Sequence, residues 1–324
     1  MIKRALALLA LILLISVAAL SLGAADVSQV WSHIFNPFFD PTSSSHQIIW
    51  QIRAPRVGAA ILIGASLGIA GVLAQGSTNN PLADPAILGT TAGAAMGVVT
   101  GVLLNIVTIG SIGAVVLAAM GALLATLLTF SLARSALQLI TIGIGVSAIL
   151  TALVGLALSM ISRPDARSIS FWSFGSLALV TPKSLAVLLP VMCIGAVMAW
   201  KIAPTVDLLS LGDDSVRHIG FDPQKIRLRS FALLAILIAA TVSSVGSIAF
   251  LALAAPHIAR YLLGPQNRKL VFYSAAIGAL ILLVADTASR ALVPPNELPI
   301  GLLTSLLGAP ILILTLKRGG DIWR

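Results

Sequence analysis

Asp286 is the one acidic residue deep within a long apolar stretch of this sequence, which makes it the first candidate for chemistry. An ionisable side chain in such a stretch is costly in a membrane and often functional, for example in a proton relay. Arg290 follows four residues later, so the two side chains share one helix face and can form an ion pair. The spacing leaves two interpretations open, a structural pair and a proton-coupled transport site.

Three arginines stand near the ends of apolar stretches. Arg53 and Arg56 bracket Pro55 where one stretch begins, and Arg290 closes another. Three cations at one end of a helical bundle could receive carboxylates from a partner protein as charge-assisted hydrogen bonds. They could also anchor the helices by extending toward the membrane interface. Composition alone favours neither interpretation.

The longest internal polar segment, about 204–229, offers a further acidic cluster. Asp213 and Asp214 suit the N-terminus of a short helix, whose dipole favours negative charge, and Gly220 is well placed to end it. A short helix of this kind indicates a docking element. The alternative is the metal site of a membrane-embedded transferase, formed by Asp213, Asp214, His218 and Asp222. The flanking stretches supply no second acidic motif for such a site, so we expect the chain to bind no metal.

No phosphate-binding loop of the form G-x-x-x-x-G-K-[ST] occurs in the sequence. If ATP drives this protein, another chain must therefore bind it. We expect no catalytic residue and no cofactor on this chain.

The elements that must position these residues are membrane helices. Of the 324 residues, 58% are hydrophobic and 10% are charged, where a soluble domain carries about 25% charged residues. The composition excludes a soluble enzyme, a disordered chain and a disulfide scaffold, and it predicts extensive contact with lipid. The net charge of +9 does not indicate a nucleic-acid partner, because the basic residues are scattered between apolar stretches.

Charges, prolines and glycines divide the chain into ten apolar stretches. They are 5–23, 54–75, 84–104, 111–131, 139–160, 184–203, 228–246, 248–264, 270–289 and 300–316. The boundary between the seventh and eighth rests on the polar run Ser243–Ser247. The sequence predicts an all-α membrane protein whose ten transmembrane helices form one compact bundle, a single domain over 1–324, with a first outer loop at about 24–50.

The basic residues also predict the orientation. With both termini in the cytoplasm, fourteen of the twenty Lys and Arg residues lie inside and six outside, which satisfies the positive-inside rule. Glycines recur at four-residue spacing at Gly64 and Gly68, and again at Gly93, Gly97 and Gly101. Such faces predict close helix packing.

Four groups of motifs, in order along 50–316, resemble a known family. The first runs from Arg53-Ala54-Pro55-Arg56 through Gly64, Gly68 and Gln75 to Asn80-Pro81-Leu82-Ala83-Asp84-Pro85. The second is Phe171-Trp172-Ser173-Phe174-Gly175, and the third is Leu211-Gly212-Asp213-Asp214 with Ile219-Gly220. The fourth comprises Gly246–Phe250, Pro256–Arg260, Asp286, Arg290, Glu297-Leu298-Pro299-Ile300-Gly301 and Gly308-Ala309-Pro310. The ordered set resembles the FecCD family, the iron-siderophore, haem and cobalamin permeases of type II ABC importers.

The resemblance implies a ten-helix subunit that pairs with a second copy or a paralogue around a translocation path. It also implies two ABC ATPase subunits, which hold ATP and Mg²⁺, and a periplasmic or lipid-anchored substrate-binding protein. Glutamates of that binding protein would dock on Arg53, Arg56 and Arg290. ATPase coupling would fall to Leu208, Leu211, Gly212, Asp213, Asp214, Arg217 and Gly220.

A cytoplasmic gate is implied at Asn80, Pro81 and Leu82. A second gate element near Ser135–Leu139 is not carried over, because Ala136-Leu137 replaces the small polar pair of the cobalamin permease. Segments 142–146 and 252–260 look closest to ferric-siderophore permeases, especially those for catecholate chelates, with haem and cobalamin as alternatives. The resemblance implies a multi-pass protein of the bacterial inner membrane. A proton-coupled secondary transporter using Asp286 stays as the remote alternative.

Overall fold

The computed structural model describes residues 2–23, 27–36, 38–108, 111–133, 135–161, 163–178, 180–294 and 296–318. Every regular element within these ranges is a helix. The α-helices are α1 (Ile2–Ser21), α2 (Val30–Phe35), α3 (Ser44–Gln47), α4 (Ala54–Thr78), α5 (Thr90–Leu103), α6 (Ile112–Leu132), α7 (Ala136–Met160), α8 (Arg163–Ser173), α9 (Pro182–Leu208), α10 (Asp213–His218), α11 (Pro223–Val245), α12 (Leu251–Leu263), α13 (Asn267–Ala291) and α14 (Ile300–Arg318). A π-helix η1 (Ile48–Arg53) and two 3₁₀ turns, η2 (Pro85–Leu88) and η3 (Leu209–Leu211), complete the set.

Each of the ten predicted apolar stretches coincides with one helix. Seven helical segments of the described chain are long and apolar enough to cross a membrane. Three others, in α5, α12 and α14, are apolar but shorter. The all-α class is confirmed, and the number of ten crossings stays a prediction.

Two of the shorter helices begin later than predicted for a local reason. The stretch expected from 84 starts with a 3₁₀ turn, which Asp84 caps by accepting a hydrogen bond from the Ala86 amide at 2.9 Å. Gly89, at φ 81°, then separates this turn from α5. The stretch expected from 248 is preceded by a break in which Gly246 and Phe250 have φ values of 75° and 64°. This break confirms the predicted separation of the seventh and eighth stretches.

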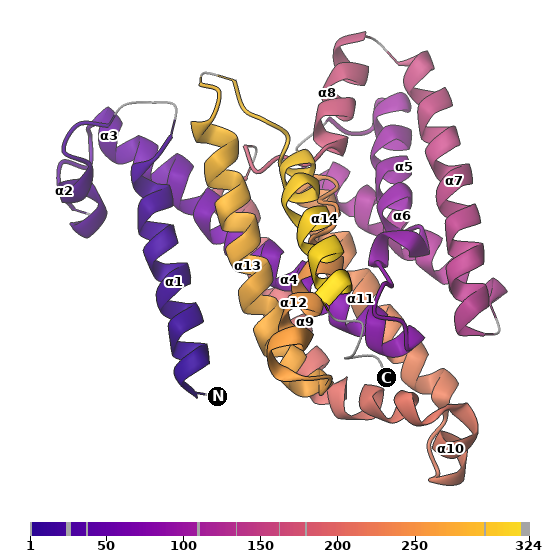
Figure 1. Ribbon diagram of the computed structural model, residues 1–324. Coiled ribbons are helices and arrows are strands. Elements are labelled where there is room, and N and C mark those ends of the chain that lie inside the picture. The colour runs from indigo at the N-terminus through magenta and orange to yellow at the C-terminus, as the bar shows by residue number, and fades with distance from the viewer. Residues whose placement is uncertain are drawn as a thin grey trace.

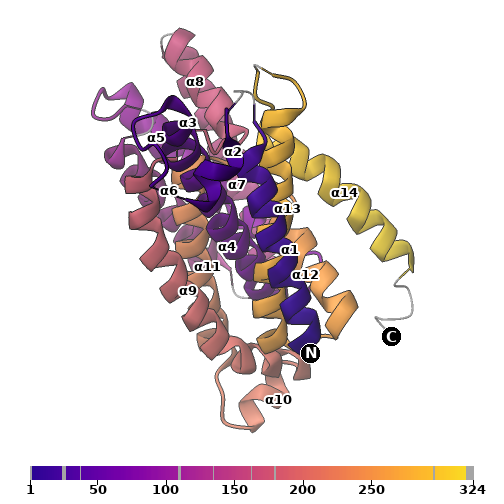
Figure 2. The same cartoon turned by 90° about the vertical axis from the view of Figure 1, so that its left-hand side faces the viewer.

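The centre of the bundle is α4, which packs against α9, α11, α12 and α13 (Figures 1 and 2). A β-carbon on Gly64 would collide with the backbone carbonyl of Gly278, and one on Gly68 with that of Ser274. Absence of these β-carbons lets α4 and α13 touch along their backbones. The packing role predicted for this glycine pair is confirmed.

A second close crossing joins α5 to α6. A β-carbon on Gly97 would meet the Leu117 carbonyl, and one on Gly93 would meet that of Gly121. At the periphery, α1, α6, α7 and α9 keep large apolar side chains exposed, as surfaces that face lipid or another subunit do.

Short elements gather at the two ends of the bundle. In both views α10 and the N-terminal end of α1 lie at one end, which we call the α10 end (Figures 1 and 2). The helices α2, α3 and α8 lie at the opposite end, which we call the α8 end. Apolar periodicity did not predict the bounds of these four short helices. The sequence predicted a short helical turn only at the position of α10.

Candidate functional site

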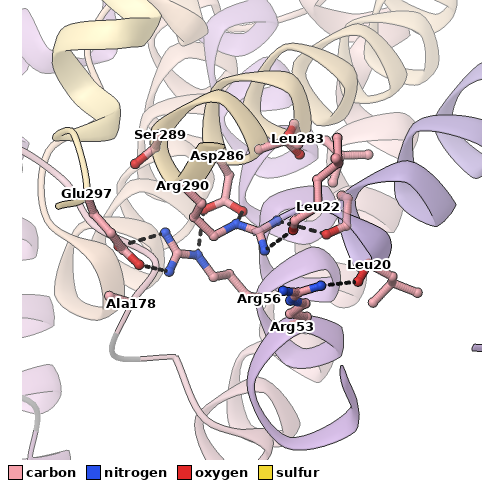
Figure 3. Close-up of polar contacts among 12 residues, drawn as sticks. Leu20, Leu22, Arg53, Arg56, Ala178, Leu283, Asp286, Ser289, Arg290 and Glu297 are labelled. Carbon is pink, nitrogen blue, oxygen red and sulfur yellow. Dashed lines mark hydrogen bonds and ion pairs between the residues drawn. The ribbon is translucent and has the colours of Figure 1, made fainter. Parts of the chain in front are cut away.

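Five charged side chains form a cluster near the α8 end, drawn in Figure 3. They are Arg53, Arg56, Asp286, Arg290 and Glu297, and we call them the arginine cluster. Arg53 closes η1 and Arg56 lies in the first turn of α4, while Asp286 and Arg290 lie one turn apart on α13. Glu297 comes from the connection between α13 and α14.

Arg56 is at the centre of the cluster. Its Nε donates to Asp286 Oδ1 at 2.7 Å, and its two terminal nitrogens donate to Glu297 Oε1 and Oε2 at 2.8 and 3.0 Å. Arg56 is 4% exposed and Asp286 is fully buried, whereas the Glu297 side chain keeps 32% of its exposure. The geometry is a bidentate charge-assisted pair between Arg56 and Glu297, combined with a buried ion pair to Asp286.

Asp286 also pairs with Arg290, whose Nε lies 3.2 Å from Asp286 Oδ2. The pair predicted from the four-residue spacing is therefore present. Because two guanidinium groups flank one carboxylate, the negative charge of Asp286 is held between two positive charges. Protonation of Asp286 would leave both buried arginines without this partner.

The other two arginines bind the last turn of α1. Arg53 donates to the backbone carbonyls of Leu20 and Ser21, both at 2.9 Å. Arg290 donates to those of Ala19 and Leu22, at 3.1 and 3.3 Å. Carbonyl groups at a helix C-terminus lack intrahelical donors and carry partial negative charge, so cations stabilise them. The arginine cluster thus fastens the end of α1 to α4 and α13.

The structure brings the three predicted docking arginines together, but it does not leave them at the surface. Arg53, Arg56 and Arg290 are 3%, 4% and 5% exposed, and each binds groups within the subunit. Interface anchoring by extended, exposed side chains therefore does not describe them. Docking of a partner's carboxylates on these residues stays a prediction.

Glu297 is held in place by a short strap, residues 297–301. Leu298 exchanges hydrogen bonds with Ser289 of α13, its amide donating to the Ser289 carbonyl and its carbonyl accepting from the Ser289 hydroxyl. The Ile300 and Gly301 amides donate to the carbonyls of Gly175 and Phe174, at 3.1 and 3.0 Å. Two of the sequence motifs thus meet at this point.

The break after α11 lies beside the same contact between the strap and Phe174–Gly175. The Ser176 amide donates to the Val245 carbonyl at 2.8 Å, and β-carbons on Gly175 and Gly246 would lie close to the backbone carbonyls of Ser247 and Trp172. These glycines also have φ values of 83° and 75°, a region that L side chains rarely adopt. Close backbone contact therefore explains why glycine stands at both places.

At the α10 end, the short helix predicted in the polar segment is confirmed. Asp213 and Asp214 lie in the first turn of α10, and Gly212 and Gly220 flank the helix at φ 85° and 86°. Leu208 ends α9 and Leu211 is exposed beside α10. Arg217 pairs with Asp214 at 3.0 Å on the exposed face. Within the described residues, no group of three or more His, Cys, Asp or Glu side chains is placed to hold a metal ion.

Arg227 connects α10 to the rest of the bundle. Its two terminal nitrogens donate to Asp213 Oδ1 and Oδ2 at 2.7 and 2.8 Å, and its Nε donates to the Ser77 carbonyl at 3.2 Å. These hydrogen bonds from Arg227 lower the pKa of Asp213 below its ordinary value. One side chain on α11 therefore ties α10 to the last turn of α4, a role that the sequence alone did not indicate.

The predicted gate residues follow directly after that turn. Asn79, at φ 49°, ends α4, and the Asn80 amide donates to the Gln75 carbonyl at 3.1 Å. The Asn80 side chain accepts from the Leu82 amide at 2.9 Å, which folds Asn80, Pro81 and Leu82 into a turn. Leu82 is exposed.

A pocket of about 580 Å³ opens beside this turn, between the ends of α4, α9, α12 and α13. Asn80 and Pro81 line it, together with Arg260. Arg260 donates to Gln75 Oε1 at 2.8 Å, and the Gln75 amide donates to the Leu253 carbonyl at 3.3 Å. The turn at Asn80–Leu82 is thus connected to α12 as well as to α10.

A second pocket, of about 360 Å³, lies among α5, α7, α8 and α11. Its lining is weakly polar, with hydroxyl groups of Thr91, Ser147 and Thr151 among apolar side chains, and Trp172 at its wall. Its lining residues carry no charged side chain. Such a surface can pass a polar ligand without holding it through ion pairs.

These features define a class of protein, a helical membrane protein with charged connections at both ends of its bundle. The FecCD transport family matches residues 8–318, and the chain belongs to that family. The iron(3+)-hydroxamate import system permease FhuB of Bacillus subtilis (strain 168) is 36% identical over 305 residues, 93% of this chain and 79% of that protein. The hemin transport system permease HmuU of Yersinia pestis is 34% identical over 318 residues, 94% of each chain.

A solved structure agrees with this assignment. It is described as an inward-facing conformation of a metal-chelate type ABC transporter. The two folds superpose with a TM-score of 0.88 at 28% identity, over 98% of this chain and 100% of the other. The family predicted from the ordered motifs is confirmed, and with it the class of transport permeases.

Proposed function

We propose that this chain is the permease subunit of an ATP-binding-cassette importer that moves a ferric siderophore across the bacterial inner membrane. It receives the chelate from a periplasmic or lipid-anchored substrate-binding protein. It pairs with a second copy or a paralogue, and both termini face the cytoplasm. Two ATPase subunits at the α10 end bind ATP and Mg²⁺. The orientation rests on the distribution of basic residues, of which Arg134 and Arg324 lie outside the described residues.

The observation that carries this proposal is the attachment of α10. This helix lies at the end of the bundle, where an ATPase can reach it, and Arg227 links it to the last turn of α4 (Figures 1 and 2). A movement of α10 imposed by the ATPase would pull on the Ser77 carbonyl and hence on the turn at Asn80–Leu82. ATP binding and hydrolysis in the partner would thereby shift the bundle between outward-open and inward-open populations.

The substrate assignment rests on similarity. The Bacillus subtilis relative is named for iron(3+)-hydroxamate import, and segments 142–146 and 252–260 resemble ferric-siderophore permeases. Haem is the second candidate, supported by the 34% identity to the hemin permease over 94% of each chain. Cobalamin is a further alternative within the family.

The arrangement of Asp286 weighs against a proton-coupled secondary transporter. This carboxylate is fully buried and pairs with Arg56 and Arg290. A proton carrier needs a carboxylate that alternates between a charged and a neutral state along a path of titratable groups. Asp286 is instead paired with two guanidinium groups of the same subunit.

The experiment is to purify the complex from its own host in mild detergent and measure its native mass. We expect a P-loop ATPase to accompany the chain, with a stoichiometry that distinguishes a homodimer from a heterodimer. Reconstituted vesicles would then be assayed for ATP-dependent uptake of iron-labelled hydroxamate and catecholate siderophores and of haem. A chain that purifies alone and drives uptake from a proton gradient would contradict the importer assignment.

A second measurement tests the docking residues. Binding of the co-purified substrate-binding protein is compared between the natural permease and its Arg53→Glu and Arg290→Glu variants. We expect weaker association in both variants, and a strong dependence on ionic strength in the natural protein. Unchanged affinity would remove these residues from the docking surface.

A further inference from the structure

We propose that Glu297 occupies the place on Arg56 that a carboxylate of the binding protein takes on docking, so that docking exchanges one carboxylate for another. This inference rests on the proposed function, because it assumes a partner that presents acidic side chains. It assigns to Glu297 the role of an internal competitor for the docking site.

All three nitrogens of the Arg56 guanidinium already donate to carboxylates of the subunit. Its Nε donates to Asp286, and both terminal nitrogens donate to Glu297 in the side-by-side geometry that favours a carboxylate. With Arg56 only 4% exposed, an incoming carboxylate cannot take up the same side-by-side geometry while both partners stay in place. Bidentate docking on Arg56 therefore requires that one of them leave.

The two carboxylate partners of Arg56 differ in how easily they can leave. Asp286 is fully buried within α13 and also pairs with Arg290, so its departure would strand two charges. Glu297 keeps 32% of its side-chain exposure, and no second ion pair of Glu297 occurs among the described residues. It stands outside the helices, on the connection that leads to α14 (Figure 3). Glu297 is thus the carboxylate that can be replaced.

Exchange at Arg56 conserves the pairing of its guanidinium. One carboxylate replaces another, so the bidentate pair persists while Glu297, whose side chain is 32% exposed, returns to water. Glu297 is also the single glutamate of the sequence, where the other ten acidic residues are aspartates. The longer side chain spans the distance from the strap to Arg56.

Exchange of the carboxylate on Arg56 would also affect α14. Glu297 belongs to the strap whose Ile300 and Gly301 amides donate to the carbonyls of Gly175 and Phe174. Ile300 and Gly301 also begin the first turn of α14. Release of Glu297 therefore loosens the segment that joins α13 to α14. Docking at one end of the bundle would in this way reach a helix at its periphery (Figure 2).

The test compares the affinity of the co-purified substrate-binding protein for the complete transporter in lipid nanodiscs, at low and moderate salt. Glu297→Gln removes the competing charge and keeps the side-chain shape. We expect it to bind the partner about tenfold more tightly than the natural protein. Glu297→Asp keeps the charge of the cluster but shortens the reach to Arg56, and we expect a smaller gain. A gain in affinity cannot arise from a damaged fold.

Asp40→Asn is the matched control. Asp40 is an exposed acid of the outer loop that accepts a hydrogen bond from the Thr42 hydroxyl and is not one of the five residues of the arginine cluster. Its loss changes the net charge by the same amount, so we expect its affinity to match that of the natural protein. An equal gain in Asp40→Asn would show general electrostatic attraction and would overturn the exchange.

The remaining outcomes separate this inference from the proposed function. If Arg53→Glu weakens docking while Glu297→Gln and Glu297→Asp bind like the natural protein or more weakly, the importer assignment stands and the exchange is wrong. If the natural protein binds no substrate-binding protein at all, the proposed function itself fails.

Discussion

Arg227 binds Asp213 through both oxygens of its carboxylate, at 2.7 and 2.8 Å, and so joins α11 to the short helix α10. The same guanidinium donates to the Ser77 carbonyl, one residue before the end of α4. The three contacts leave little freedom for α10 to move without α4. The pair therefore relates the proposed ATPase contact to the proposed gate turn.

We predict that Arg227→Ala uncouples the movement of α10 from the turn at Asn80–Leu82. Transport driven by ATP should fall at least tenfold, because α10 loses its link to α4, while the ATPase subunits stay bound. The charge reversal Asp213→Arg with Arg227→Asp should recover part of the transport, and Asp213→Lys with Asp214→Lys should abolish both ATPase binding and transport. The measurements are ATP-dependent uptake in vesicles and the composition of the purified complex.

Lys225→Ala supplies the control for this experiment. Lys225 lies two residues before Arg227, and its ammonium is 3.7 Å from Asp222, but both side chains are exposed, and such pairs contribute about 0–1 kcal/mol. We expect near-normal uptake. If Arg227→Ala transports as well as Lys225→Ala does, the link through Ser77 has no part in transport.

The Asp213 contact should be insensitive to pH near neutrality. Arg227 lowers the pKa of Asp213 below its ordinary value of 3.8 in the folded protein. The unfolded chain then binds the proton first as pH falls, so the stabilisation is complete above about pH 4 and disappears as pH drops through the lowered pKa. The difference in thermal unfolding midpoint between the natural protein and Asp213→Asn should be constant from pH 5 to 8 and shrink below pH 4. A difference that already changes between pH 6 and 7 would contradict this assignment.

Asp286→Asn should destabilise the fold strongly. The substitution leaves Arg56 and Arg290 buried without their shared counter-charge, and breaking a buried ion pair in this way costs about 3–5 kcal/mol. Thermal unfolding in detergent measures the loss, with Asp40→Asn as an exposed control expected to lie within about 0.5 kcal/mol of the natural protein. A stable Asp286→Asn variant that has lost transport would instead revive the proton-relay interpretation.

Gly68→Ala should separate α4 from α13. The added β-carbon would meet the backbone carbonyl of Ser274, which cannot rotate away as a side chain could, so the helices themselves must move apart. Overpacking of this kind costs about 1–3 kcal/mol. Gly145→Ala on α7 is the matched control, since nothing lies within 4 Å of its added β-carbon. Equal unfolding midpoints for the two variants would show that the close crossing contributes nothing to stability.

The features that could be predicted from the sequence are those set by residues close together along the chain. The apolar stretches, the break between α11 and α12, the caps of α10 and the Asp286–Arg290 pair each depend on residues within a few positions of one another. The glycine pair at Gly64 and Gly68 was also recognisable from its spacing. Periodicity and spacing carry this information because they follow the geometry of a single helix.

The contacts between side chains of different helices could not be predicted from the sequence. Arg56 and Glu297 are 241 positions apart, and Arg227 and Ser77 are 150 apart. No periodic pattern relates residues at such separations. The burial of the three predicted docking arginines was missed for the same reason. The carbonyls and carboxylates that accept their hydrogen bonds belong to α1, α13 and the strap. The ordered motifs did supply one usable signal, because Glu297 stands within one of them.

The π-helix η1 has a consequence for the outer loop. The segments α3, η1 and α4 form one continuous helix over Ser44–Thr78, and its turn at Ile48–Arg53 is wider than an α-helical turn. A turn of this width accommodates one additional residue in about the rotation of a regular α-helical turn. If the same residues were wound as a regular α-helix, the additional residue would rotate everything before it by about 100° around the helix axis. The wide turn therefore lets α3 and the outer loop keep their direction relative to Arg56 despite the additional residue.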